Sequence, residues 1–337
     1  MLFDYLTRTA GKVRPCFHRS RCLRMRHRNN GCDLCLRECP KGALDFSREA
    51  PLDQEKCNSC FRCTAVCPTE ALSCGEFDFE QFLRQVRSAG SAPVIGCASS
   101  RAGIHPAIPC IGLLSDAHLA VLALSQEEIG IDTTPCAACT NGEMAQVLQE
   151  RLAHLSPILN GRIRLGAYPH RDLPKTSRRD FFSTLRTGFA REVATAISAK
   201  DKPVSLAYSE KQLPLERKLL NEILKTAAER ESGWLKKALY FAVEVDERCT
   251  LCTACSAFCP TGSLKRKKEE GWTLRFRSAS CPGCGLCTDA CRRDAIRLRA
   301  ADPETDVFAW RTLRRDSQSD RQGEVPEVPE RSAAAGR

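Results

Sequence analysis

Most of the 22 cysteines in this 337-residue chain fall into four short runs with nearly the same spacing. The full spacing is C-x2-C-x2-C-x3-C, and it begins at Cys57, Cys249 and Cys281. A shorter run, Cys32-x2-Cys35-x3-Cys39, lacks the first cysteine. Proline follows the last cysteine in every run except the fourth, where Cys291 precedes Arg292.

This spacing suits a cluster of iron and sulfide. Gaps of two residues turn the chain around one cluster, so that one tight loop presents three thiolates, and the proline that ends the loop supplies no N–H needing a partner. Structural zinc needs one or two C-x2-C pairs, and a disulfide framework would not repeat one spacing. The runs therefore predict iron–sulfur sites.

The runs come in two pairs, and each pair resembles a bacterial two-cluster ferredoxin, a pseudo-twofold β-α-β fold around two [4Fe–4S] cubanes. The chain as a whole then resembles a polyferredoxin. In that family the pairing is crossed, because the last cysteine of each run binds the neighbouring cluster. The resemblance implies three complete ligand sets, which are Cys39, Cys57, Cys60 and Cys63; Cys249, Cys252, Cys255 and Cys291; and Cys259, Cys281, Cys284 and Cys287.

The remaining cluster would take Cys32, Cys35, Cys67 and a residue at position 29, which is Asn29. Cys22 could replace it, since nine residues easily loop back to a cubane corner. Cys74 or Cys16 could do the same, or the site could hold a three-iron cluster with three cysteines. We expect Cys22; the alternative is that it is an ordinary buried thiol.

Residues 91–170 have a different pattern, in which short apolar strands alternate with amphipathic helices. Expected strands lie near 93–97, 131–136 and 162–167, and expected helices at 116–128 and 141–154. This alternation predicts a small α/β domain with a parallel sheet.

Four further cysteines, Cys97, Cys110, Cys136 and Cys139, fall at the predicted strand ends, where open α/β sheets place ligands. Their order resembles the iron–sulfur delta subunit of methyl-viologen-reducing hydrogenase, without that family's extra cysteine pair beside Cys97. The resemblance implies a fifth site with a [2Fe–2S] cluster. Zinc, or buried free thiols in a domain that docks a partner, are the alternatives.

Residues 171–240 are predicted to form a helical connector. It contains Arg178-Arg179, similar to the core of a twin-arginine signal, but an amphipathic helix with Phe182, Phe189 and Ile197 follows instead of an apolar segment. A second amphipathic helix is expected over 213–230. From Ala301 on, charged, Ser and Pro residues dominate, which predicts a disordered tail.

Composition narrows the classes of function. No run of 18 apolar residues occurs, which argues against a membrane span. The formal charge of +10 falls to about +2 once four clusters are counted at about −2 each, so the basic excess is no sign of nucleic-acid binding. There is no G-x-G-x-x-G after a strand, no P-loop and no histidine pair with catalytic spacing.

The sequence thus predicts an α+β protein in which two dicluster ferredoxin domains, residues 1–90 and 241–300, flank a small α/β domain at 91–170 and the connector. We expect a cytoplasmic, anaerobic electron-transfer protein with four [4Fe–4S] clusters and no catalytic site of its own. Its partner would be a hydrogenase, formate dehydrogenase, molybdoenzyme or disulfide-reductase-type complex. The alternative is an accessory ferredoxin that binds a maturing molybdoenzyme through the Arg-Arg helix.

Overall fold

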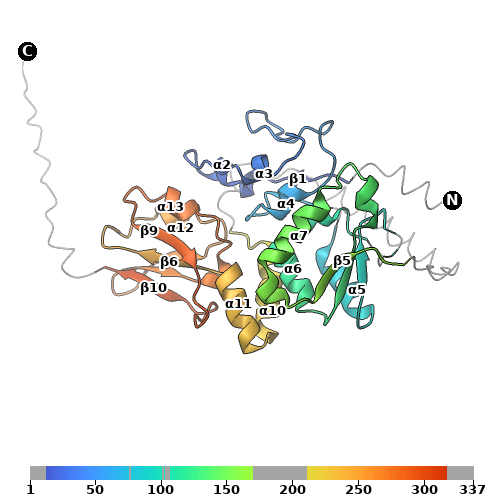
Figure 1. The fold of residues 1–337 in the computed structure, drawn as a ribbon. Coiled ribbons are helices and arrows are strands. Elements are labelled where there is room, and N and C mark those ends of the chain that lie inside the picture. Colours follow the sequence, from blue (N-terminus) through green and yellow to red (C-terminus); the bar gives the residue numbers. More distant parts are fainter. Residues whose placement is uncertain (1–12, 76, 101, 103–106, 170–210, 317–337) are drawn as a thin grey trace, which may run out of the picture.

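The computed structural model describes residues 13–75, 77–100, 102, 107–169 and 211–316 (Figure 1). We call 13–75 the N-terminal module, 77–169 the middle domain and 240–316 the C-terminal module. In Figure 1 the N-terminal module, in blue, lies above the other two, and the yellow helices of 211–239 lie between the middle domain and the C-terminal module.

The N-terminal module has little regular structure, because its cysteine loops take up most of the chain. Its two ends meet in an antiparallel pair, in which Cys16 is opposite Ser73 and Phe17 opposite Leu72. A bridge between Leu44 and Leu52 joins the two cysteine runs. The elements are β1 (Cys16–Phe17), η1 (Arg19–Arg21), α2 (Leu23–Arg26), α3 (Leu34–Arg37), α4 (Arg62–Ala65) and β2 (Leu72–Ser73).

The middle domain has the predicted parallel sheet, with strand order β3-β4-β5. Strands β3 and β4 are wholly buried, as continuous apolar runs in parallel sheets usually are. The elements are α5 (Phe79–Ser88), β3 (Val94–Gly96), η2 (Ile111–Leu113), α6 (Asp116–Ala123), β4 (Ile129–Asp132), η3 (Thr134–Ala138), α7 (Met144–His154), α8 (Ser156–Leu159) and β5 (Ile163–Gly166).

Helix α5 belongs to the core of the middle domain, although the sequence placed it in a ferredoxin domain ending at residue 90. It begins after Asp78, whose carboxylate accepts a hydrogen bond from the backbone N–H of Gln81. Its apolar side chains then recur at helical spacing, and Phe82 and Val86 are buried in one cluster with Ile95 of β3. The helix therefore packs in the middle domain, although it precedes the boundary at residue 90 that the cysteine runs suggested.

The C-terminal module repeats one unit twice, in which a cysteine loop is followed by a short helix and a strand. Strand β6, which precedes the first cysteine loop, pairs antiparallel with β9, which follows the second, and β7 and β8 form a hairpin. The elements are β6 (Phe241–Val245), α12 (Ala254–Phe258), β7 (Leu264–Lys268), β8 (Trp272–Phe276), η4 (Ser278–Ser280), α13 (Leu286–Asp289), β9 (Ile296–Ala300) and β10 (Arg311–Arg315).

The prediction of a disordered tail from Ala301 is wrong for residues 301–316. Strand β10 pairs antiparallel with β8 and turns the hairpin into a three-stranded sheet. Val307 is buried, and Leu313 packs against the core of the module. Lys265 and Arg277 lie over the ring of Trp310. These few apolar contacts order a segment whose composition is mostly polar.

Two helices, α10 (Leu215–Thr226) and α11 (Glu229–Leu239), replace the single helix expected over 213–230. The break falls at Ala227 and Ala228, whose backbones are extended. Leu220 and Leu235 are buried in the core cluster shared with the middle domain. The helices are thus packed elements and not only a connector. The Arg178-Arg179 pair and the helix expected after it lie outside the described residues, as do residues 317–337.

A cluster of buried and partly buried polar side chains lies where the N-terminal module, the middle domain and α10 meet. Ser115 caps α6, and its hydroxyl lies 3.1 Å from Nδ1 of His118. That nitrogen is 3.6 Å from Oε1 of Glu216, and Oε1 of Glu70 accepts a hydrogen bond from the Glu216 N–H. Burial lowers the pKa of His118 to about 4 and raises that of Glu216 to about 7. Near neutral pH, His118 is therefore uncharged, and Glu216 keeps its proton to a higher pH than an exposed carboxyl group does.

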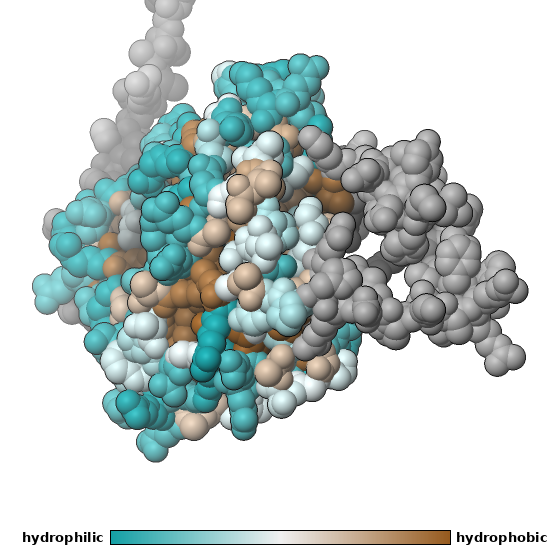
Figure 2. All heavy atoms as spheres, turned by 45° about the vertical axis from the view of Figure 1, so that its right-hand side comes forward, coloured by the Kyte–Doolittle hydropathy of each residue, from teal (hydrophilic) through white to brown (hydrophobic). Residues whose placement is uncertain are grey.

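None of the described helices is long and apolar enough to span a bilayer. The face drawn in Figure 2 is mostly hydrophilic, with apolar surface visible at the bottom of a hollow.

Candidate metal-cluster sites

The first nest consists of Cys22, Cys32, Cys35 and Cys67, which line one pocket. Cys22 is 7% exposed and lies between η1 and α2, two short turns that fold residues 19–26 back over the pocket. Asn29 is exposed and does not line this pocket. The geometry thus brings Cys22 to the place that position 29 would have taken in the ferredoxin pattern.

The two other candidates for this position lie elsewhere. Cys16 is exposed on β1, and Cys74 directly follows β2. Neither lines the pocket of the first nest. The structure therefore favours Cys22 among the three thiols that the sequence left open.

The second nest consists of Cys39, Cys57, Cys60 and Cys63, which line another pocket. Its loop needs two left-handed residues, Ser59 and Phe61, both with φ of 58°. Residues other than glycine rarely adopt this backbone conformation unless the surrounding structure holds it in place. The two turns direct the cysteines of the loop inward.

The two C-terminal nests are recognised by how closely their thiols crowd one another. Burial raises the pKa of Cys255 to about 12, and the neighbouring Cys249, Cys252 and Cys291 add to the shift. In the fourth nest burial raises the pKa of Cys284, and its three partners, Cys281, Cys259 and Cys287, add to it. Burial and crowding therefore keep Cys255 and Cys284 protonated at neutral pH unless bound cations favour their thiolates. The crossed sets expected from the ferredoxin resemblance are thus close together in space.

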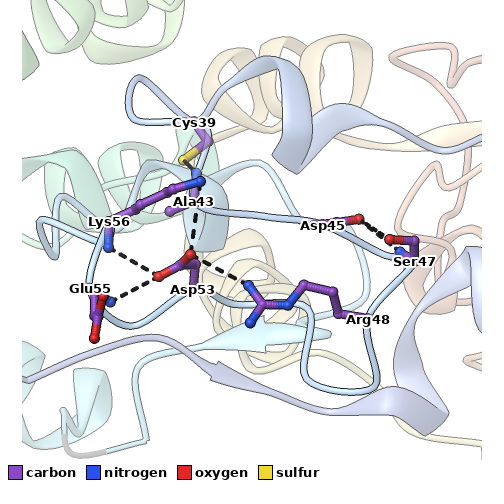
Figure 3. Close-up of polar contacts among 8 residues, drawn as sticks. All are labelled: Cys39, Ala43, Asp45, Ser47, Arg48, Asp53, Glu55 and Lys56. Carbon is purple, nitrogen blue, oxygen red and sulfur yellow. Dashed lines mark hydrogen bonds and ion pairs between the residues drawn. The ribbon is translucent and has the colours of Figure 1, made fainter.

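One backbone turn recurs after the last cysteine of every run. The residue three positions after that cysteine has a positive φ angle. The residue four positions after it forms a hydrogen bond with the sulfur, as Ala43 does with Cys39 in the first run (Figure 3). The left-handed residues are Gly42, Glu70, Gly262 and Asp294. The N–H groups of Ala43, Ala71 and Ala295 donate to the sulfur at 3.3, 3.2 and 3.3 Å, and the hydroxyl of Ser263 lies within hydrogen-bond distance of the Cys259 sulfur, at 3.3 Å.

This turn was missed in the sequence, and only part of it could have been found there. Glycine at positions 42 and 262 signals a left-handed residue, but Glu70 and Asp294 carry no such signal. Hydrogen bonds to a thiolate favour its charged form. At Cys259 burial works to raise the pKa, but hydrogen bonds led by Ser263 outweigh it, and the pKa lies below the usual value.

The middle nest lies at the carboxyl ends of the parallel strands. Cys97 follows β3, Cys110 precedes η2, and Cys136 and Cys139 lie within and after η3. Burial raises the pKa of Cys110 to about 12, and Cys60, Cys97 and Cys139 contribute as neighbours. The four cysteines that the sequence grouped are therefore close in space, and Cys60 of the second nest lies beside them.

The chain packs tightly between the middle nest and the second nest. Gly112 lies so close to the Cys60 carbonyl and the Met144 side chain that a Cβ would collide with both. The Asn141 amide donates to the Asn58 carbonyl at 3.1 Å. The sequence carries no local sign of this contact, because the two loops are 83 positions apart.

Several polar atoms at this contact are buried without a hydrogen-bond partner among the described residues. They are Nδ2 of Asn58, Oγ of Ser59 and Oδ1 of Asn141. The amide and the hydroxyl can both donate to sulfide or thiolate sulfur. Buried donors without partners usually have a role for an absent group, and these fit iron–sulfur clusters in the adjoining nests. In the described part of the chain, no three His, Cys, Asp or Glu side chains come close enough to share a single metal ion.

Comparison with known proteins identifies both ends of the chain. Residues 28–71 and residues 242–292 each match a family described as a 4Fe-4S dicluster domain. One subunit of the ion-translocating oxidoreductase complex of Methanosarcina acetivorans is 46% identical over 43 residues, 12% of this chain and 16% of that protein. Pyruvate synthase subunit PorD of Thermotoga maritima is 37% identical over 63 residues, 19% of this chain and 59% of that protein.

The chain therefore carries a 4Fe-4S dicluster domain at each end, which confirms the resemblance seen in the cysteine runs. It spans less than two thirds of either relative. No solved structure was found to match it.

Proposed function

We propose that this iron–sulfur electron-transfer protein holds [4Fe–4S] clusters in its four nests and relays single electrons through them. It would act as a subunit or shuttle of an oxidoreductase complex. The observation that carries the proposal is the repeated turn, which offers a hydrogen bond to the last cysteine of every run. Hydrogen bonds to these four sulfur atoms favour the thiolate, which is the form that binds metal.

When bound, a cubane accepts and returns one electron without changing its ligands. The residues of this chain hold the thiolates in place, exclude water and set the electrostatic environment. Hydrogen bonds such as that from Ser263 to Cys259 offset negative charge on sulfur. The left-handed residues place these hydrogen-bonding groups next to the sulfur.

We extend the proposal to the middle nest as a fifth site, holding a [2Fe–2S] cluster; the zinc alternative gains no support, because no three described side chains come close enough to share one metal ion. The unpartnered Asn58 amide and Ser59 hydroxyl support a sulfur-rich group there. Cys60 and Cys110 would then bring the second and middle sites next to each other. Electrons entering at either one could reach the other.

The proposed partner is a redox protein. The two relatives are named as subunits of an ion-translocating oxidoreductase complex and of pyruvate synthase, so a role inside a larger oxidoreductase is the simplest interpretation. A hydrogenase, formate dehydrogenase, molybdoenzyme or disulfide-reductase-type complex remains the prediction for this chain. The cysteine runs repeat one ligand spacing and do not resemble a disulfide framework, which supports a reducing compartment such as the cytoplasm.

The test is the iron and acid-labile sulfide content of the full chain purified without oxygen. Four cubanes require about 16 irons per chain, and a two-iron centre in the middle nest raises this to about 18. The reduced protein should show the EPR signals of reduced iron–sulfur clusters. Colourless protein, or protein loaded only with zinc, would refute the proposal.

A matched pair of variants checks the ligand assignment. Replacing Cys252 by Ala should lower the iron content, because Cys252 belongs to the third nest. Replacing Cys74, which lies outside all five nests, should leave it unchanged. Equal iron contents in the two variants would contradict the assignment.

A further inference from the structure

The N-terminal and C-terminal modules meet at one polar contact between residues 259 positions apart. The Asn30 amide nitrogen donates to Oδ2 of Asp289 at 2.6 Å. Asn30 is 8% exposed whereas Asp289 is exposed, so the bond is shielded from water at its Asn30 end only. Neither residue belongs to a nest.

Both residues are tied closely to nest cysteines. The side-chain oxygen of Asn30 accepts a hydrogen bond from the Cys32 N–H at 3.1 Å, so Asn30 spans from the first nest to the other module. Asp289 ends α13, between Cys287 of the fourth nest and Cys291 of the third. The contact therefore lies between loops that hold proposed clusters on both sides.

Further contacts are made by residues near the first and fourth nests. The ring of His27 packs edge-on against Phe258, with ring centroids 4.8 Å apart, and Phe258 directly precedes Cys259 of the fourth nest. The ammonium of Lys211 lies 2.7 Å from the carbonyl oxygen of Cys259. The Asn30–Asp289 and His27–Phe258 contacts thus join the two modules, and Lys211, which belongs to neither module, adds a contact to the fourth nest.

We propose that electrons pass between the two modules at this contact, with Asn30 and Asp289 as positioning residues. This inference rests on the proposed function. One electron leaves the first site and one arrives at a site of the C-terminal module, so one side is oxidised as the other is reduced and no bond is formed or broken. Electron tunnelling weakens steeply with separation, which makes the shortest covalent and hydrogen-bonded path between clusters the effective one.

The contact allows a test by exchange of the two side chains. Asn30→Asp keeps the acceptor for the Cys32 N–H but puts a carboxylate against Asp289. Two carboxylates facing each other have no donor between them, and their negative charges repel. The double variant Asn30→Asp with Asp289→Asn restores one donor and one acceptor, with the roles reversed. Asp289→Asn alone is the matched control, because two amides can still form the bond.

The measurement is the magnetic interaction between reduced clusters of the two modules, seen as broadening and faster spin relaxation in the EPR spectrum of the full chain. We expect this interaction to be lost in Asn30→Asp, and kept in Asp289→Asn and in the double variant. Transfer of electrons from one module to the other, followed after rapid mixing with limiting reductant, should slow in the same variant only.

Two results would overturn the inference: an unchanged interaction in Asn30→Asp, or a loss that the double variant does not reverse. The second would point to the added charge beside the first nest and not to the contact. Failure of the proposed function is distinguishable, because it would show as missing iron or missing EPR signals in the unaltered protein.

Discussion

Replacing Cys22 by Ala tests the one cluster ligand that the ferredoxin pattern did not supply. Cys22 is 7% exposed and shares one pocket with Cys32, Cys35 and Cys67. Removing its sulfur leaves three thiolates, which suit a three-iron cluster, so the iron content should fall by about one atom per chain, from about 16 to about 15. If the middle nest holds iron, both counts rise together.

The substitution should leave the fold intact. Deleting one buried atom from a side chain costs about 1 kcal/mol, against a total stability of about 5–15 kcal/mol for a typical domain. The assay is iron per chain, together with the EPR spectrum of the oxidised protein, in which a three-iron cluster is paramagnetic and a cubane is silent. The change should therefore appear as a new signal as well as a lower count.

Cys16→Ala and Cys74→Ala are the matched controls, because both thiols were candidates in the sequence and neither lines the pocket. Both variants should retain the full iron content and remain silent when oxidised. If instead Cys22→Ala kept all its iron while one of the controls lost an atom, the placement of η1 and α2 over the pocket would be wrong.

Three further predictions concern the surroundings of the nests. Ser263→Ala removes a hydrogen bond to Cys259 worth about 0.5–1.5 kcal/mol. The reduction potential of the fourth site should therefore drop by about 20–60 mV in an EPR redox titration. An unchanged potential would show that the hydroxyl does not act on the sulfur. In the fold Glu216 binds its proton more tightly than its ordinary pKa of 4.5 implies, and His118 less tightly than its ordinary 6.5, so their effects on stability oppose each other. In Glu216→Gln the free energy of unfolding should rise by about 1–3 kcal/mol from pH 4 to 6.5, because only the His118 effect remains. In His118→Gln it should fall by a similar amount from pH 4.5 to 7, because only the Glu216 effect remains. Anaerobic denaturant unfolding measures both, and two flat profiles would contradict the pKa directions. Gly112→Ala should push the middle nest away from the second nest and speed hydrogen exchange in that loop, whereas an unaltered exchange rate would mean that the loops are not in contact.

Much of the site was readable in the sequence because its ligands are local. Three cysteines separated by two residues each are held near one another by the chain itself, whatever the rest of the protein does. The runs beginning at Cys57, Cys249 and Cys281 therefore identified both dicluster domains, which the family comparison confirms. The strands of the parallel sheet were predictable for a similar reason, since burial on both faces leaves an unbroken apolar run.

Other features were hidden because they depend on contacts between distant segments. Strand β10 has only Leu313 to anchor it, and its pairing with β8 depends on a hairpin some 40 positions earlier. Composition reports the average character of a segment, and here that average was polar. A few buried side chains were enough to order it.

The residues by themselves determined that this chain binds iron and sulfide at both ends, because thiolate chemistry and short loop lengths leave little else for such runs to do. Only the tertiary structure shows that Cys22 lines one pocket with Cys32, Cys35 and Cys67, that the middle nest adjoins the second, and that Asn30 meets Asp289. Each of these joins segments far apart in the chain, and such contacts are selected by the packing of whole modules and not by any local pattern.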